Sequence, residues 1–176
     1  MKIWRFVELP DYVTILSGIA AVLAMFQSIE RHFSVAAFLM LASVICDYLD
    51  GKIARAMNRQ NKQFGSVLDT VTDIVSFGAA PVVFGYCVGM TGPVHIIVLL
   101  AFVVAALLRL ARFHAMPVSG TAFTGMPVTY NSVFIPLVYF GFRATSLEEN
   151  YLASALLVVY VVLAMLMVSS IRWIKF

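Results

Sequence analysis

Charged residues are scarce in this chain of 176 residues: Asp, Glu, Lys and Arg make up 12% of it, whereas 62% of the residues are hydrophobic. Soluble domains contain about a quarter charged and about half apolar residues. The shortage of charge therefore excludes an ordinary water-soluble domain and favours a chain that lies in a membrane. The length suits one bundle of helices, and we expect a single membrane domain over residues 1–176 with no separate soluble domain.

Cysteine is also rare, and Cys46 and Cys87 both fall in apolar stretches. Neither has a second thiol or a histidine at the spacing of metal ligands, so we interpret both as packing residues. No small-residue cleavage site follows a short apolar core near the start, and a cleaved signal peptide is not expected. The net charge of +3 reflects how basic residues are placed around a membrane, and we expect no nucleic-acid partner.

Long apolar stretches approach the roughly 20 residues that a helix needs to cross a hydrocarbon core. We expect an all-α integral membrane protein with six transmembrane helices, at residues 12–29, 33–56, 66–89, 93–114, 127–143 and 151–172. Residues 1–10, with tryptophan and basic side chains, predict a short N-terminal interfacial helix.

The distribution of basic residues predicts the orientation of these helices. All but two of the 12 Lys and Arg residues fall on one side of the membrane, the exceptions being Arg31 and Arg143. Because basic loops are retained in the cytoplasm, we expect a multi-pass cell-membrane protein with both termini cytoplasmic.

Four of the nine acidic residues lie inside the second and third predicted helices, namely Asp47, Asp50, Asp69 and Asp73. Residues three or four apart share a helix face, so each helix presents one acidic pair. In an antiparallel hairpin that turns near residue 60, Asp47 lies level with Asp73 and Asp50 with Asp69, in the cytosolic half of the membrane. Ionisable groups at such depth are expensive and usually functional.

Four carboxylates in a low-dielectric site need either protonation or bound cations. Oxygen ligands favour Mg²⁺ or Mn²⁺, with Ca²⁺ able to bind as a substitute, rather than zinc. Two such ions close together would hold both the attacked phosphate and its leaving group. A purely structural pairing of the acids with Lys52 and Arg55 accounts poorly for four of them at matched depths.

The stretch Asp47-x2-Asp50-Gly51-x2-Ala54-Arg55-x9-Gly65-x3-Asp69-x3-Asp73 resembles the signature of the CDP-alcohol phosphotransferase family. The resemblance implies two divalent cations, a CDP-linked lipid donor of the CDP-diacylglycerol or CDP-archaeol type, release of CMP, and a homodimer. It implies that the four aspartates are metal ligands and that Asp73 is also the general base.

The same resemblance implies a nucleotide pocket lined by Gly51, Ala54, Arg55 and Gly65. The first helix opens with Pro10-Asp11-x2-Thr14, which is similar to the Pro-Asn-x2-Thr of many family members. Thr14 is therefore implied in CDP binding. Asp11 replaces the family's asparagine and could form a hydrogen bond in the same pocket.

The acceptor alcohol is indicated by Leu108-Arg109-Leu110-Ala111-Arg112-Phe113-His114 and by Phe123-Thr124-Gly125-Met126-Pro127. Both stretches resemble elements of the phosphatidylserine synthases of this family, with His114 replacing asparagine and Met126 replacing leucine. The resemblance implies L-serine as the acceptor, bound by Arg109, Arg112 and Thr124. Physically, two arginines three residues apart could bind a carboxylate, or could equally anchor the helix to lipid phosphates. His114 by itself is interpreted as an interfacial residue.

Two other functions are weighed against this hypothesis. A sibling transferase that uses glycerol phosphate or inositol phosphate should need a denser basic pocket than Arg109 and Arg112 provide. A small ion-coupled transporter would use the four carboxylates for protons or cations, but it leaves the offsets of Gly51, Ala54 and Gly65 unexplained.

Overall fold

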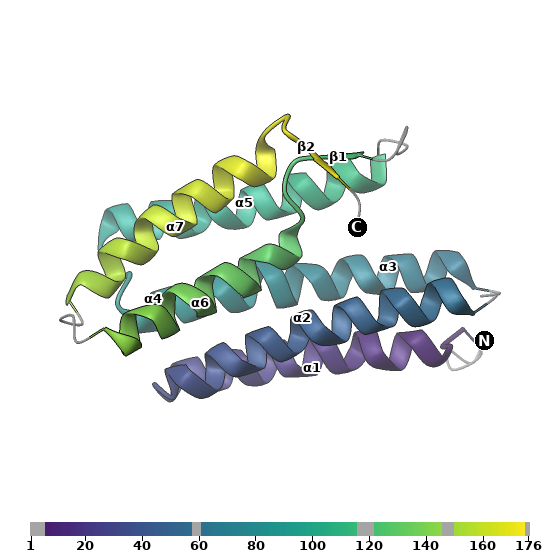
Figure 1. Cartoon of the computed structure of the whole chain (residues 1–176), viewed down its shortest axis with the longest axis horizontal. Helices are drawn as coiled ribbons and strands as arrows, with labels where there is room; N and C mark the ends of the chain where they lie inside the picture. The colour runs from purple at the N-terminus through teal and green to yellow at the C-terminus, as the bar shows by residue number, and fades with distance from the viewer. Residues whose placement is uncertain (1–5, 58–60, 116–121, 146–149, 175–176) are drawn as a thin grey trace.

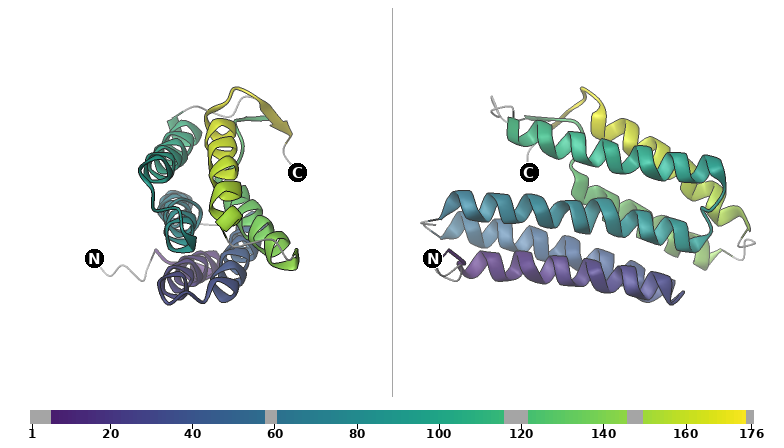
Figure 2. Two further views of the ribbon diagram at one scale, coloured as in Figure 1. Left: turned by 90° about the vertical axis from the view of Figure 1, so that its left-hand side faces the viewer. Right: turned by 180° about the vertical axis from the view of Figure 1, so that it is seen from behind.

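The computed structural model of the chain describes residues 6–57, 61–115, 122–145 and 150–174, which form a bundle of long helices (Figure 1). Helices α1 (Leu9–Ile29) and α2 (Phe33–Ala56) pack together on one side of the bundle. Helices α5 (Pro93–Ala115) and α7 (Asn150–Val168) form the opposite side. Between them lie α6 (Asn131–Ala144) and a long third stretch made of α3 (Lys62–Asp73), the π-helix η2 (Ile74–Ala79) and α4 (Ala80–Val88) (Figure 2).

Five stretches within the described ranges are long and apolar enough to cross a membrane. They are Leu9–Ile29, Phe33–Ala56, Lys62–Val88, Pro93–Ala115 and Tyr151–Val168. The all-α membrane class is thereby confirmed. Helix α6 has 14 residues, about 21 Å at 1.5 Å per residue, and follows the short 3-10 helix η3 (Val128–Tyr130). It is shorter than the other five, so a sixth crossing stays a prediction.

The start of the chain differs from the prediction of a separate interfacial helix over residues 1–10. Residues 1–5 lie outside the described part, residues 6–8 are not helical, and Leu9 and Pro10 belong to α1. The helix begins there because Asp11 Oδ2 accepts a hydrogen bond of 2.7 Å from the backbone N–H of Glu8. Pro10 fits this first turn, where its missing N–H needs no partner.

The last helix also differs from the prediction, because it ends at Val168 rather than at residue 172. Backbone N–H groups of the loop after α5 bond to carbonyl groups near the end of α7. The N–H of Met126 donates to Leu166 O at 3.1 Å, and the N–H of Gly125 donates to Ile171 O at 2.9 Å. Beyond these bonds, strand β1 (Ala122–Thr124) pairs antiparallel with β2 (Arg172–Ile174), with Phe123 opposite Trp173. The loop after α5 is thus joined to the C-terminal segment.

The π-helix η2 directly follows Asp73 and was not predicted from the sequence. Wider π-type turns disturb the regular bonding of the backbone, and two side chains at the start of α6 bond to carbonyl groups there. Ser132 Oγ donates to Ser76 O at 2.8 Å, and Asn131 Nδ2 donates to Phe77 O at 3.0 Å. Both side chains are buried, so α6 is held against the third stretch one turn from Asp73.

Candidate metal and nucleotide site

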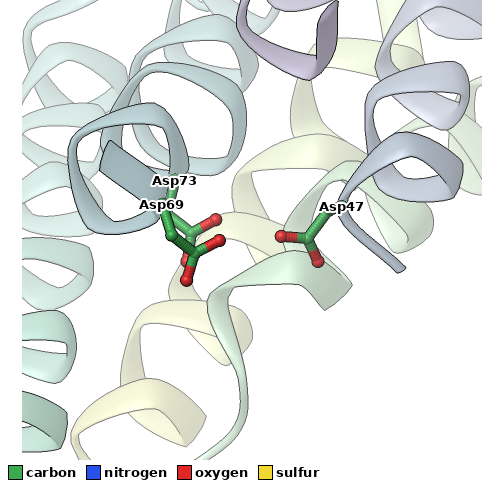
Figure 3. A group of neighbouring side chains, drawn as sticks. All are labelled: Asp47, Asp69 and Asp73. Carbon is green, nitrogen blue, oxygen red and sulfur yellow. The ribbon is translucent and has the colours of Figure 1, made fainter. Parts of the chain in front are cut away.

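Three of the four predicted metal ligands come together between α2 and α3. Asp47, Asp69 and Asp73 can each offer a carboxylate oxygen such that these atoms lie within 4.8 Å of one another. Figure 3 shows Asp69 and Asp73 projecting from α3 toward Asp47 on α2. Helical spacing explains the arrangement, because residues four apart lie on one face and the hairpin of α2 and α3 brings the two faces together.

The cluster has the chemistry of a site for a divalent cation. Its three carboxylates are half-buried, where unpaired charges are poorly solvated. One cation that interacts with the cluster is Arg109 of α5, which is 8% exposed and acts electrostatically on Asp73. A single guanidinium cannot balance three ionised carboxylates. A donor set made of carboxylate oxygens fits Mg²⁺, Mn²⁺ or Ca²⁺.

Asp50, the fourth predicted ligand, faces a neighbouring pocket. Its Oδ2 lies 2.6 Å from the hydroxyl of Thr14, and the residue is 5% exposed. The pocket has a volume of about 240 Å³ and lies between α1, α2 and α3. Asp69 lines it together with Asp50, so the pocket is continuous with the acidic cluster.

The pocket collects most of the residues implied in nucleotide binding. Thr14, Gly51, Ala54 and Gly65 all line it. Arg55 is exposed, and its Nη1 lies 3.5 Å from the point where a Cβ on Gly51 would stand. The guanidinium therefore lies over the bare backbone of Gly51, at the edge of the pocket.

The two arginines predicted to share an acceptor pocket differ in their contacts. Arg109 is buried, with its guanidinium carbon 5.3 Å from the centre of the Phe113 ring. Arg112 instead donates to Val168 O at 3.0 Å and to Ser169 O at 3.3 Å, so it caps the C-terminal end of α7. Arg109 is the one whose charge acts on the acidic cluster. The side chain of Thr124 lies outside what the structure describes.

Two polar residues that the sequence did not single out also reach the site. Thr129 Oγ1 lies 3.5 Å from Asp47 Oδ2, which connects the turn before α6 to the acidic cluster. Ser66 lines the pocket beside Gly65. The available signals were the Phe-Thr-Gly-Met-Pro turn just before Thr129 and the position of Ser66 next to a glycine of the signature. Asp11 bonds to the start of its own helix through the N–H of Glu8.

Known proteins are similar to this chain along most of its length. The family model for CDP-alcohol phosphatidyltransferase matches residues 7–174. The archaetidylserine synthase of Methanothermobacter thermautotrophicus is 32% identical over 174 residues, which cover 98% of this chain and 72% of that protein. The CDP-diacylglycerol–serine O-phosphatidyltransferase of Helicobacter pylori is 32% identical over 95% of this chain and 72% of its own length. The Saccharomyces cerevisiae protein of the same name is 32% identical over 62% of this chain and 42% of its own length.

Proposed function

Because the chain belongs to the CDP-alcohol phosphatidyltransferase family, we propose that it transfers a phosphatidyl group, or its archaeal ether-lipid counterpart, from a CDP-linked lipid to the hydroxyl of L-serine. The observation that carries the proposal is the continuity of the acidic cluster of Asp47, Asp69 and Asp73 with the pocket that Thr14 and Gly51 line. Relatives from an archaeon and a bacterium that are named for serine transfer support the choice of acceptor.

The donor lies across the pocket and the cluster in this proposal. The CDP group enters between α1, α2 and α3, where Gly51 and Ala54 leave room beside the backbone. Thr14 and Gly65 complete the wall, and Arg55 offers a planar guanidinium to a phosphate at the edge. Asp47, Asp50, Asp69 and Asp73 would hold two divalent cations, Mg²⁺ or Mn²⁺, which supply charge neutralisation for the diphosphate and the departing CMP.

The acceptor is activated and oriented by residues of α3 and α5. Arg109, buried and acting on Asp73, receives the carboxylate of serine. Asp73 takes the proton from the serine hydroxyl as its oxygen attacks the phosphorus nearest the lipid. The new bond joins serine oxygen to that phosphorus, and the bond to the CMP oxygen breaks. The chain's contribution is positioning and electrostatic stabilisation.

The proposed topology follows from the basic residues. The ends of α2 and α5 and the start of α3 lie at one end of the bundle and carry Arg55, Lys62 and Arg112 (Figure 1). The acidic cluster lies inward from that end, since Asp69 is seven residues from the start of α3. By the positive-inside rule this end faces the cytoplasm, with both termini and the active site in the cytosolic half. The enzyme is proposed to act as a homodimer, as the family resemblance implies.

An acceptor assay tests the proposal directly. The enzyme in detergent, with Mg²⁺ or Mn²⁺, is supplied with CDP-diacylglycerol or CDP-archaeol and, in separate reactions, with labelled serine, glycerol phosphate or inositol phosphate. We expect CMP release and labelled lipid with serine. Lipid product from a phosphorylated acceptor but none from serine would contradict the serine assignment and favour a sibling transferase. No CMP release with any acceptor would contradict the transferase and favour ion transport.

A further inference from the structure

The ring of His114 bridges α5 to α3 at the end of the bundle that carries the acidic cluster. Its Nε2 lies 2.9 Å from Thr70 Oγ1 and 3.4 Å from Ser66 Oγ. Its Nδ1 lies 3.2 Å from Leu110 O, one turn back on its own helix. An exposed histidine held on both ring nitrogens has a fixed orientation, which an interfacial side chain in lipid headgroups does not need.

The partners indicate which nitrogen carries the proton. A carbonyl oxygen can only accept, so the contact with Leu110 O requires a proton on Nδ1. In the neutral ring Nε2 is then an acceptor for a hydroxyl proton of Thr70 or of Ser66. The Thr70 hydroxyl also lies 2.8 Å from Ser66 O, so its single proton can bond to either of these two acceptors. The bond within α5 orients the ring, and the bond to α3 is the one that joins the two helices.

The helical periodicity of α3 relates this bridge to the catalytic residues. Ser66, Thr70 and Asp73 are spaced four and three residues apart, so they lie along one stripe of α3. His114 contacts Thr70, and Arg109 acts on Asp73 one turn deeper in the bundle. The two helices run antiparallel (Figure 1), so the step from Thr70 to Asp73 along α3 runs beside the step from His114 back to Arg109 along α5. A shift of α5 along or away from α3 would alter both interactions together.

The alignment of α5 with α3 depends on side chains, because the two helices pack little against each other. Helix α5 packs closely on η2 and α4, deeper in the bundle, but little on α3 over the residues described. Near its C-terminal end α5 is therefore hydrogen-bonded to α3 through the side chain of His114, and the charge of Arg109 acts on Asp73 without a direct contact. Arg112 on the same turn is turned away to cap α7 and gives no support toward α3.

We propose that His114 is a positioning residue for the acceptor site, which holds α5 on α3 and thereby sets Arg109 opposite Asp73. This inference rests on the proposed function, in which Arg109 binds the acceptor and Asp73 activates it. The nucleotide pocket lies among α1, α2 and α3, and of the two bridge partners on α3 it is lined by Ser66, the more distant one at 3.4 Å, and not by Thr70. Loss of the bridge should therefore weaken use of the acceptor while leaving the donor site nearly unchanged.

Two substitutions separate the bridge from the bond within α5. In His114→Gln the terminal amide reaches the place of Nε2 and can still bond to Thr70. In His114→Asn the shorter amide stands in the place of Nδ1 and keeps at most the contact with Leu110. We expect the asparagine variant to raise the KM for serine by roughly threefold to tenfold, the worth of one hydrogen bond. The glutamine variant should remain within about twofold of wild type, and the KM for the CDP-lipid should change little in either.

The partner on α3 gives an independent measurement. Thr70→Val removes the hydroxyl at nearly constant shape and should raise the KM for serine as His114→Asn does. The double variant should be no worse than either single variant, because each removes the same bond. Thr72→Val is the matched control, since Thr72 lies on the face of α3 toward α1, and it should behave as wild type.

The outcomes distinguish this inference from the proposed function. Equal losses for the glutamine and asparagine variants, additive effects in the double variant, or an equal rise in both KM values would overturn the bridge. Wild-type enzyme that ignores serine would overturn the proposed acceptor instead. The same five variants, measured with the acceptor that the enzyme does use, would then decide whether His114 positions α5.

Discussion

The hydroxyl oxygen of Thr14 lies 2.6 Å from Oδ2 of Asp50, so α1 is joined directly to the acidic residue that α2 contributes to the proposed nucleotide pocket. Asp50 is 5% exposed, and a carboxylate at such depth depends on its hydrogen-bond donors. The same threonine hydroxyl lies 3.2 Å from Pro10 O, which ties the contact to the first turn of α1. The start of the chain thereby becomes part of the site.

Thr14→Val should impair donor binding. The valine keeps the shape of the side chain but leaves the buried carboxylate without that donor, and bonds to charged groups are worth about 1.5–3 kcal/mol. We expect the KM for the CDP-lipid to rise by about tenfold or more, with the KM for serine little changed. Thr14→Ser retains the hydroxyl and should stay close to wild type. Equal kinetics for the valine and serine variants would show that the bond is unimportant.

Asp73→Asn should abolish turnover in a way that added metal does not restore. The amide has nearly the shape of the carboxylate but cannot take the proton of the acceptor hydroxyl, a role worth about 10²–10⁴ in rate. CMP release measured with CDP-lipid and serine should fall by at least about a hundredfold at every Mn²⁺ concentration. Release that persists undiminished would remove Asp73 from the catalytic step.

Asp47→Asn provides the contrast, since Asp47 is proposed as a metal ligand without a role in proton transfer. Loss of one carboxylate from the cluster should raise the Mg²⁺ or Mn²⁺ concentration needed for half-maximal activity by about tenfold or more. Much of the CMP release should return at high metal concentration. Chelation of metal should stop the wild-type enzyme, and its survival in chelator would contradict the metal assignment.

The acidic cluster could be predicted because it depends on local geometry. Asp69 and Asp73 share a face through helical spacing, and a short hairpin brings Asp47 to their level, so the meeting of these three predicted ligands followed from sequence alone. Asp50 lies on the predicted face of α2, but its carboxylate contacts Thr14 of α1 and lies outside the cluster of the other three aspartates. The shift depends on how α1 packs against α2, which residue spacing does not determine.

The role of Arg112 could not be predicted, because it depends on contacts between distant segments. Three-residue spacing put Arg109 and Arg112 near one another on α5, where charge alone fitted a substrate pocket and a lipid anchor equally, and the family resemblance implied a shared acceptor pocket. The position where α7 ends decides otherwise, since Val168 O and Ser169 O lie within reach of Arg112. The π-helix after Asp73 has no periodic signal either, and its bonds to Asn131 and Ser132 arise from the packing of α6.

Gly51→Ala should separate stability from nucleotide binding. A Cβ at this position would meet no atom closer than Arg55 Nη1 at 3.5 Å, an ordinary contact with a flexible side chain. The folded enzyme should therefore tolerate alanine, with an unchanged unfolding temperature in detergent. The added methyl would project where the CDP group is proposed to approach the helix, and we expect the KM for the CDP-lipid to rise at least about tenfold. Unchanged donor kinetics would place the nucleotide elsewhere.

Gly125→Ala should damage the connection between the loop after α5 and the end of α7. Gly125 has a φ of +82°, and a Cβ there would stand 2.5 Å from Met167 O, a backbone atom that cannot rotate away. The left-handed conformation alone costs a non-glycine residue about 1–2 kcal/mol, and the clash adds to it. Because this loop leads to Thr129 beside Asp47, we expect a lower unfolding temperature together with reduced CMP release.

Gly141→Ala is the matched control for that substitution. Gly141 lies in α6, where an added Cβ meets nothing within 4 Å, and alanine is favoured over glycine inside a helix by about 0.5–1 kcal/mol. Its unfolding temperature should be equal to or above that of wild type, with full activity. If Gly125→Ala matched Gly141→Ala in both measurements, the loop would be free to move away from α7. The bonds of Gly125 and Met126 to Ile171 and Leu166 would then not determine where that helix ends.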